Sequence, residues 1–171
     1  MLNFNVIIVT TDLSEYSLRA LPYAIGLAER FDAKLKVVSV NEPMQIPDVA
    51  FVGVDPVPSQ HERDTAIQDK LDEIVGNLPI SMDVEAKVLE GPVVDQIVKY
   101  AREINADLIV SCTHGRTGLA HALMGSTAEG LVRRAPCPVL TLKHPMPIAA
   151  CVRGVFDGMW TEYRELSCPG A

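Results

Sequence analysis

The chain has 171 residues, 48% of them apolar and 22% charged, and it carries a formal net charge of −7. A chain of this length is expected to fold as one domain with a sizeable core. The acidic balance argues against a nucleic-acid partner, which would need a basic face. There is no pattern typical of a signal peptide, a membrane-spanning helix or a Cys-x-x-Cys pair. We therefore expect a cytoplasmic protein with free thiols and no membrane partner.

Short β-branched runs alternate with helical patterns along the first 143 residues. The predicted strands are 6–10, 34–40, 83–89, 107–111 and 138–142. Apolar residues recur at helical spacing between the strands, first in one helix that starts at Ser14 and then in three more, the last over 126–134. This order predicts an α/β fold: a single doubly wound, Rossmann-like domain with a five-stranded, mostly parallel sheet flanked by helices.

Two segments do not follow this alternation. Residues 41–59 form a long, proline-rich connection at the carboxyl end of the second predicted strand, and it could be a ligand or partner flap or a spacer. Residues 144–171 follow the predicted domain 1–143 as an extension. Its apolar residues at helical spacing predict one extra amphipathic helix. That helix could pack on its own domain or dock a second subunit or partner.

The segment Cys112–Gly118, with Gly125-Ser126-Thr127 after it, follows a buried strand and opens a helix. Glycines allow the backbone to approach an anion, and the N–H groups of a first helical turn point toward it. The segment matches neither the P-loop pattern nor Gly-x-Gly-x-x-Gly. It therefore predicts a phosphate site whose assignment depends on the neighbouring residues.

Residues 10–12 and 112–115 would face each other if the first and fourth strands are neighbours, since ligands bind where the strand order of such a sheet reverses. Asp12 could then bind a ribose or water around a metal ion, or it could simply favour the start of a helix. Ser126 and Glu129 match a capping box, which is a structural alternative compatible with phosphate contact. His114 and Arg116 are the cations nearest the predicted phosphates, although His114 could equally be structural.

Three stretches resemble the universal stress protein family. They are Val-Thr-Thr-Asp-Leu-Ser-Glu (9–15), Thr-His-Gly-Arg-Thr-Gly (113–118) and Gly-Ser-Thr-Ala-Glu-Gly-Leu-Val-Arg-Arg-Ala-Pro-Cys-Pro-Val-Leu (125–140). The resemblance covers residues 3–143. It implies a five-stranded α/β fold, a homodimer joined through the edge strand Val139–Leu142 and, in one branch of the family, bound ATP with Mg²⁺ held through the phosphates.

The ATP-binding branch carries Gly-x-x-Gly-x(9)-Gly-[Ser/Thr], in which Gly115, Gly125 and Ser126 match this chain and Cys112 replaces the first glycine. The resemblance implies contact of Asp12 with the ribose and of the Val40 backbone with adenine. The candidate nucleotide-binding residues are Thr10, Thr11, Asp12, Val40, Ser111, Cys112, His114, Gly115, Arg116, Gly125, Ser126 and Thr127.

The Cys112 side chain could crowd a nucleotide, so two functions remain open. One is an ATP-binding regulatory protein of the stress response, with at most slow hydrolysis, because the chain has no P-loop lysine and only His114 is near enough to act as a base. The other is a dimeric interaction module that binds no nucleotide. An adenylate-forming enzyme is disfavoured, because the phosphate motifs of that class are missing from the sequence.

Overall fold

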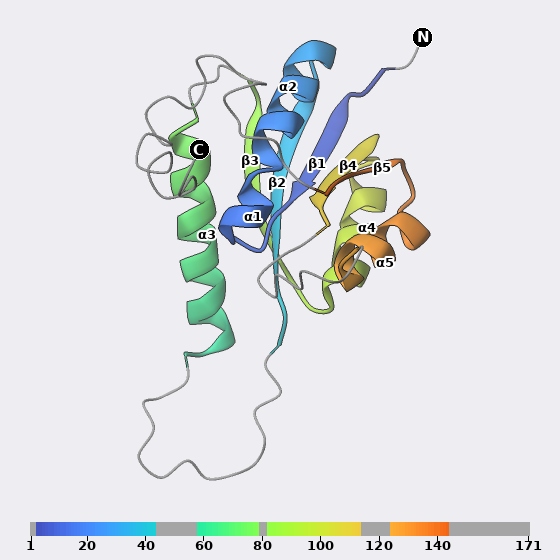
Figure 1. Ribbon diagram of the computed structural model, residues 1–171. Coiled ribbons are helices and arrows are strands. Elements are labelled where there is room, and N and C mark those ends of the chain that lie inside the picture. The colour runs from blue at the N-terminus through green and yellow to red at the C-terminus, as the bar shows by residue number, and fades with distance from the viewer. Residues whose placement is uncertain (1–2, 44–57, 79–81, 114–123, 144–171) are drawn as a thin grey trace, which may run out of the picture.

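The computed structural model describes residues 3–43, 58–78, 82–113 and 124–143 (Figure 1). Its strands are β1 (Val6–Thr10), β2 (Lys34–Asn41), β3 (Val84–Glu90), β4 (Leu108–Cys112) and β5 (Val139–Leu142). Its helices are α1 (Glu15–Leu18), α2 (Leu21–Phe31), α3 (Gln60–Gly76), α4 (Val93–Glu103) and α5 (Ser126–Arg134). The predicted α/β domain with a five-stranded sheet is confirmed.

The sheet has the strand order β3-β2-β1-β4-β5, and each neighbouring pair is parallel. Ile7, Ile8 and Val9 of β1 lie beside Leu108, Ile109 and Val110 of β4. The strand order reverses between β1 and β4, because the chain goes from β1 to β2 on one side and returns to β4 on the other. The neighbouring positions predicted for the first and fourth strands are thus confirmed.

Helices cover both faces of the sheet (Figure 1). Strand residues alternate between the faces, so Ile7 and Val9 pack in one core with residues of α2 and α3, and Ile8 packs in the other with residues of α4 and α5. All three side chains are completely buried. The central strands are therefore apolar on both faces, which accounts for their continuous β-branched runs.

The single helix expected after β1 is wrong, because the structure has two helices there. α1 ends at Leu18, and α2 begins at Leu21 with Pro22 in its first turn. Proline has no backbone N–H to donate to the preceding turn and is tolerated at the start of a helix. The apolar spacing continues across this break, so it concealed the boundary.

The helices α1 and α3 each start at a serine whose side chain caps the helix. Ser14 caps α1, as predicted, and accepts a hydrogen bond from the Ser17 N–H. Ser59 caps α3 in a full capping box with Glu62, a signal present in the sequence that the prediction missed. α3 ends before Leu78, which is nevertheless buried in the core.

Several expectations fall outside the described residues. These are most of the 41–59 connection, the 114–118 part of the predicted phosphate segment, and the extra helix in 144–171. The division of the chain at residue 143 stays a prediction. Within the described ranges, none of the helices combines the length and apolar character needed to span a bilayer.

Candidate functional site

Four buried polar residues mark the carboxyl ends of β1 and β4. Thr10, Thr11, Ser111 and Thr113 are each at most 7% exposed, although polar side chains are usually found at protein surfaces. Ligands bind at this end of a doubly wound sheet, next to the strands where the order reverses. The structure thus brings Thr10, Thr11 and Asp12 together with Ser111 and Cys112, as the sequence predicts.

Asp12 follows β1 and is held by the residue two positions further on. Its Oδ1 atom accepts hydrogen bonds from the Ser14 N–H at 3.0 Å and from the Ser14 hydroxyl. Between them, Leu13 has φ of 62°, a left-handed conformation that is rare for a bulky residue. Such backbone outliers cluster at functional sites. The turn therefore fixes the Asp12 carboxylate in one orientation.

Ser17 lies under this turn and was missed as a site residue. Its side chain is buried, and its Oγ atom lies 2.8 Å from Thr11 Oγ1 and accepts from the Asp12 N–H at 3.2 Å. The same hydroxyl donates to the Ser14 carbonyl oxygen at 2.9 Å. A serine at the third position of a capped helix is a weak sequence signal, since many such serines are exposed. Its role becomes visible only with the strand end above it.

The turn from β4 to α5 is closed through the backbone. The Gly125 N–H donates to the Thr113 carbonyl oxygen at 2.7 Å, and a Cβ atom added at Gly125 would lie 2.7 Å from that same oxygen. Only glycine permits this approach without a shift of the neighbouring backbone. The ends of the predicted phosphate segment are therefore held together, while His114, Gly115 and Arg116 lie outside the described residues.

The capping box predicted at Ser126 is wrong. Gly125 occupies the N-cap position of α5 and makes no side-chain cap, and Ser126 is the first helical residue. The Glu129 N–H donates to the Gly125 carbonyl oxygen at 3.0 Å, so Glu129 falls one position beyond that of a capping box. Ser126 is exposed and Thr127 half-buried at this helix start. The N–H groups of the first turn of α5 have no acceptor within the helix.

The Cys112 side chain lies between β4 and α1. Alternation along β4 places it on the same face as Leu108 and Val110, in the core next to α2 and α3. Its Sγ atom donates to the Tyr16 carbonyl oxygen at 3.1 Å. Burial, followed by the nearby charge of Asp12, raises the pKa of this thiol to about 11. Cys112 is therefore a protonated core residue that joins the end of β4 to α1.

Val40, the predicted adenine contact, lies on β2, one strand away from the β1–β4 boundary. It pairs with Leu89 of β3 and is packed, half-buried, against the core under α4 and α5. The Thr11 N–H donates to the Val38 carbonyl oxygen at 2.9 Å, which ties the end of β1 to β2. Val40 thus adds β2 to the strands whose carboxyl ends border the candidate site.

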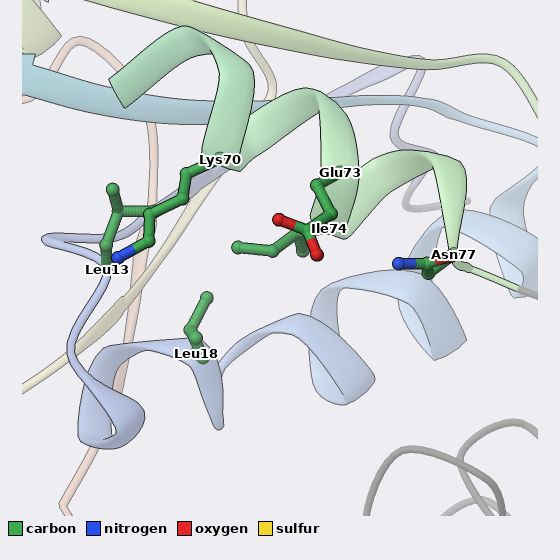
Figure 2. A pocket seen from close by; sticks show the side chains of 6 residues that line it. All are labelled: Leu13, Leu18, Lys70, Glu73, Ile74 and Asn77. Carbon is green, nitrogen blue, oxygen red and sulfur yellow. The ribbon is translucent and has the colours of Figure 1, made fainter. Parts of the chain in front are cut away.

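A separate hollow of about 290 Å³ lies between α3 and the first helices (Figure 2). Leu13 and Leu18 line it from one side and Ile74 from the other, with Lys70, Glu73 and Asn77 around them. Leu13 is the residue after Asp12, yet it faces a largely apolar space. The hollow shares this turn with the candidate site but none of the predicted nucleotide-binding residues.

The fold and the polar strand ends define a doubly wound α/β protein with a candidate ligand site where the strand order reverses. Residues 3–143 match the model of the universal stress protein family. The chain belongs to that family.

A sequence relative agrees with this assignment, and solved structures share the fold. A universal stress protein of Methanocaldococcus jannaschii is 33% identical over 147 residues, covering 83% of this chain and 84% of the relative. The structure of UspA from Lactobacillus plantarum superposes with a TM-score of 0.63 at 20% identity, covering 84% of this chain and 100% of that one. A universal stress protein solved in complex with cAMP gives 0.60 at 26% identity, covering 82% and 98%.

Proposed function

We propose that this protein binds an adenine nucleotide, ATP with Mg²⁺, at the carboxyl ends of β1 and β4, and that it serves as a cytoplasmic regulatory protein of the stress response. The observation that carries the proposal is the convergence of Asp12, the buried hydroxyls of Thr10 and Thr11, and the start of α5 at the strand-order reversal. The relative solved with cAMP supports adenine as the ligand class.

The residues of the site fit the three parts of a nucleotide. The phosphates lie at the start of α5, where N–H groups and the helix dipole favour an anion and Gly125 adds no side chain. The ribose lies near Asp12, whose carboxylate oxygens are acceptors suited to the hydroxyl groups of a sugar. Adenine lies beside the backbone of Val40. Mg²⁺ is held through the phosphates in this proposal.

The position of Cys112 supports nucleotide binding despite the departure from the family pattern. A thiol directed at the Tyr16 carbonyl oxygen occupies space between β4 and α1. The thiol therefore fills space in the core and not in the crevice. We expect the crevice to accept a nucleotide with Cys112 in place.

The test is whether the purified protein releases a nucleotide on denaturation and whether added ATP raises its Tm. We expect both, with the Tm increase lost in Asp12→Ala. Gly125→Val is a poor test, because a Cβ there meets the Thr113 carbonyl oxygen and disturbs the turn itself. The control is Glu129→Gln, an exposed change on α5. A protein that is free of nucleotide and whose Tm ATP leaves unchanged would contradict the proposal.

A second function, an interaction module that acts as a dimer, is favoured by one observation. Val132 and Leu140 are the large apolar side chains exposed among the described residues, at 52% and 37%, and Leu140 belongs to the edge strand β5. An edge strand offers unpaired backbone groups to a second chain. We propose that two copies pair through β5 (Val139–Leu142).

Leu140→Lys tests this pairing, because a charge on an edge strand opposes strand addition. Sedimentation analysis should show a dimer for the natural sequence and a monomer for the variant. If Leu140→Lys kept the mass of a dimer, the interface would lie outside β5. A dimer without ATP binding would favour the interaction module over the nucleotide-binding protein.

A further inference from the structure

The Ser17 hydroxyl is the centre of a buried hydrogen-bond network under the candidate ribose contact. It lies 2.9 Å from the Ser14 carbonyl oxygen, 2.8 Å from Thr11 Oγ1 and 3.2 Å from the Asp12 nitrogen. Both Ser17 and Thr11 are at most 6% exposed. Water therefore has little access to these groups, and each polar atom has to find its partner within the protein.

The protons of the network can be assigned in one consistent way. Ser17 donates its single hydroxyl proton to the Ser14 carbonyl oxygen, so it accepts from the Thr11 hydroxyl and from the Asp12 N–H. Thr11 Oγ1 in turn accepts from the Leu13 N–H at 2.9 Å. Ser14 directs its N–H and its hydroxyl to Asp12 Oδ1. Ser17 thus orders the backbone of residues 11–14, and the carboxylate is fixed to that backbone.

We infer that Ser17 is a positioning residue that orients the Asp12 carboxylate toward the ribose hydroxyls of a bound nucleotide. This rests on the proposed nucleotide function and adds to it the residue on which sugar recognition depends. Without the Ser17 hydroxyl, the Thr11 O–H and the Asp12 N–H lose their acceptor at a buried position. The turn, with Leu13 already in a left-handed conformation, then loses the contacts that order its backbone. Ser14, which holds the Asp12 carboxylate, loses the hydrogen bond from Ser17 to its carbonyl oxygen.

If Ser17 had only a structural role, the expected result would be different. Its loss would lower stability and weaken all nucleotides alike. A positioning serine also contributes to stability, but among the contacts with the ligand its loss affects only the one made by Asp12. Its loss therefore weakens a ligand with ribose hydroxyls and leaves one without them nearly unchanged. The ratio of two affinities separates the two roles.

The experiment measures binding of ATP and of 2′,3′-dideoxy-ATP by calorimetry, well below the Tm of each variant. We expect the natural protein to prefer ATP roughly tenfold, as is typical of hydrogen bonds to a charged group. In Ser17→Ala, ATP should weaken by roughly tenfold and dideoxy-ATP by less than about twofold, so the preference disappears. Ser17→Ala added to Asp12→Ala should have no further effect on the ratio, because both changes remove one interaction.

Two variants control for loss of stability and of volume. Val98→Ala shortens a side chain that is 3% exposed in the core under α4, away from the network, and should keep the natural preference. Ser17→Thr keeps the hydroxyl and should restore the preference if Ser17→Ala proves poorly folded.

Each remaining outcome contradicts a different claim. A preference that survives in Ser17→Ala, or an equal loss for both ligands, overturns the role of Ser17 and leaves nucleotide binding in place. A natural protein that binds both ligands equally removes the ribose contact of Asp12 and with it this inference. A natural protein that binds neither overturns the proposed function as well.

Discussion

The two turns that border the candidate site make the same connection, from a strand end to a helix start, by different means. The turn from β1 to α1 is held by side-chain hydroxyls, with Ser14 and Ser17 bonded to Asp12 and its neighbours. At the turn from β4 to α5, the two described ends are held by the backbone, through the close approach of Gly125 to the Thr113 carbonyl oxygen. One turn depends on hydrogen-bond partners and the other on the absence of a side chain.

This difference determines which changes each turn tolerates. A hydroxyl network fails when a donor or acceptor is removed, even if the volume is nearly kept. A close backbone approach fails when volume is added, even if no polar group is lost. We therefore test the two turns with opposite kinds of substitution. In the turn after β1 a hydrogen-bonding group is removed, and in the turn before α5 side-chain volume is added.

The largest effect is expected for Gly125→Ala. The new Cβ would lie 2.7 Å from the Thr113 carbonyl oxygen and displace α5 from the end of β4, lowering the free energy of unfolding by about 3 kcal/mol. Urea unfolding measures this. Gly26→Ala in α2 is the matched control, because nothing lies within 4 Å of its added Cβ, and it should stabilise by roughly 0.5–1 kcal/mol. Equal effects of the two changes would show that the close approach is relaxed in solution.

Ser17→Ala should cost about 2 kcal/mol, because it leaves the Thr11 hydroxyl and the Asp12 N–H without their acceptor at a buried position. The same urea titration measures it. Thr65→Ala, an exposed hydroxyl on α3, is the control and should change stability by less than about 0.5 kcal/mol. A cost at Ser17 no larger than at Thr65 would mean that water replaces the missing partner.

Cys112 joins the end of β4 to α1 and gives a pH-dependent prediction. Burial raises the pKa of its thiol to about 11, so the folded protein holds this proton more tightly than the unfolded chain does. The resulting stability is present below about pH 8.5 and is lost as the pH rises toward 11, by about 1–2 kcal/mol. Comparison with Cys112→Ala between pH 8 and pH 11 isolates this contribution. Parallel curves for the two proteins would contradict it.

The smallest effect is expected for Ser126→Ala. Gly125 is the N-cap of α5 and Ser126 is exposed, so the change should alter stability by less than about 0.5 kcal/mol. Ser59→Ala, which removes a full capping box from α3, should lower the free energy of unfolding by about 1 kcal/mol. Thermal melts of the two variants measure both effects. A comparable loss at Ser126 would show that it caps α5 in solution.

The strands were predictable to within a residue or so. For β1 and β4 the reason is that parallel strands buried on both faces are continuous apolar runs in the sequence. The neighbouring positions of Asp12 and Cys112 followed from the topology of such sheets. The break between α1 and α2 was not predictable from periodicity, since Leu18 and Leu21 keep the spacing of one helix while Pro22 starts another.

Side-chain direction and capping were harder to predict. The helix predicted over 126–134 has the bounds of α5, but Ser126 and Glu129 matched a capping box in which Ser126 would be the N-cap. In the structure Gly125 is the N-cap, and its close contact with Thr113 is a tertiary effect outside any local pattern. The direction of Cys112 depends on whether it belongs to β4, since alternation then places it beside Leu108 and Val110. The role of Ser17 depends on Thr11, six residues earlier, which the fold brings to it.

The hydrogen bond between the Gly125 N–H and the Thr113 carbonyl oxygen also bears on which changes of chain length the fold tolerates. The two residues that bracket positions 114–124 are joined directly by this bond, which sets the distance between the end of β4 and the start of α5. The closure free energy of a chain segment between two fixed ends rises by only about 0.6 kcal/mol when its length is doubled. We therefore expect the fold to tolerate a change of length between these two ends better than a change of side-chain volume at Gly125 itself.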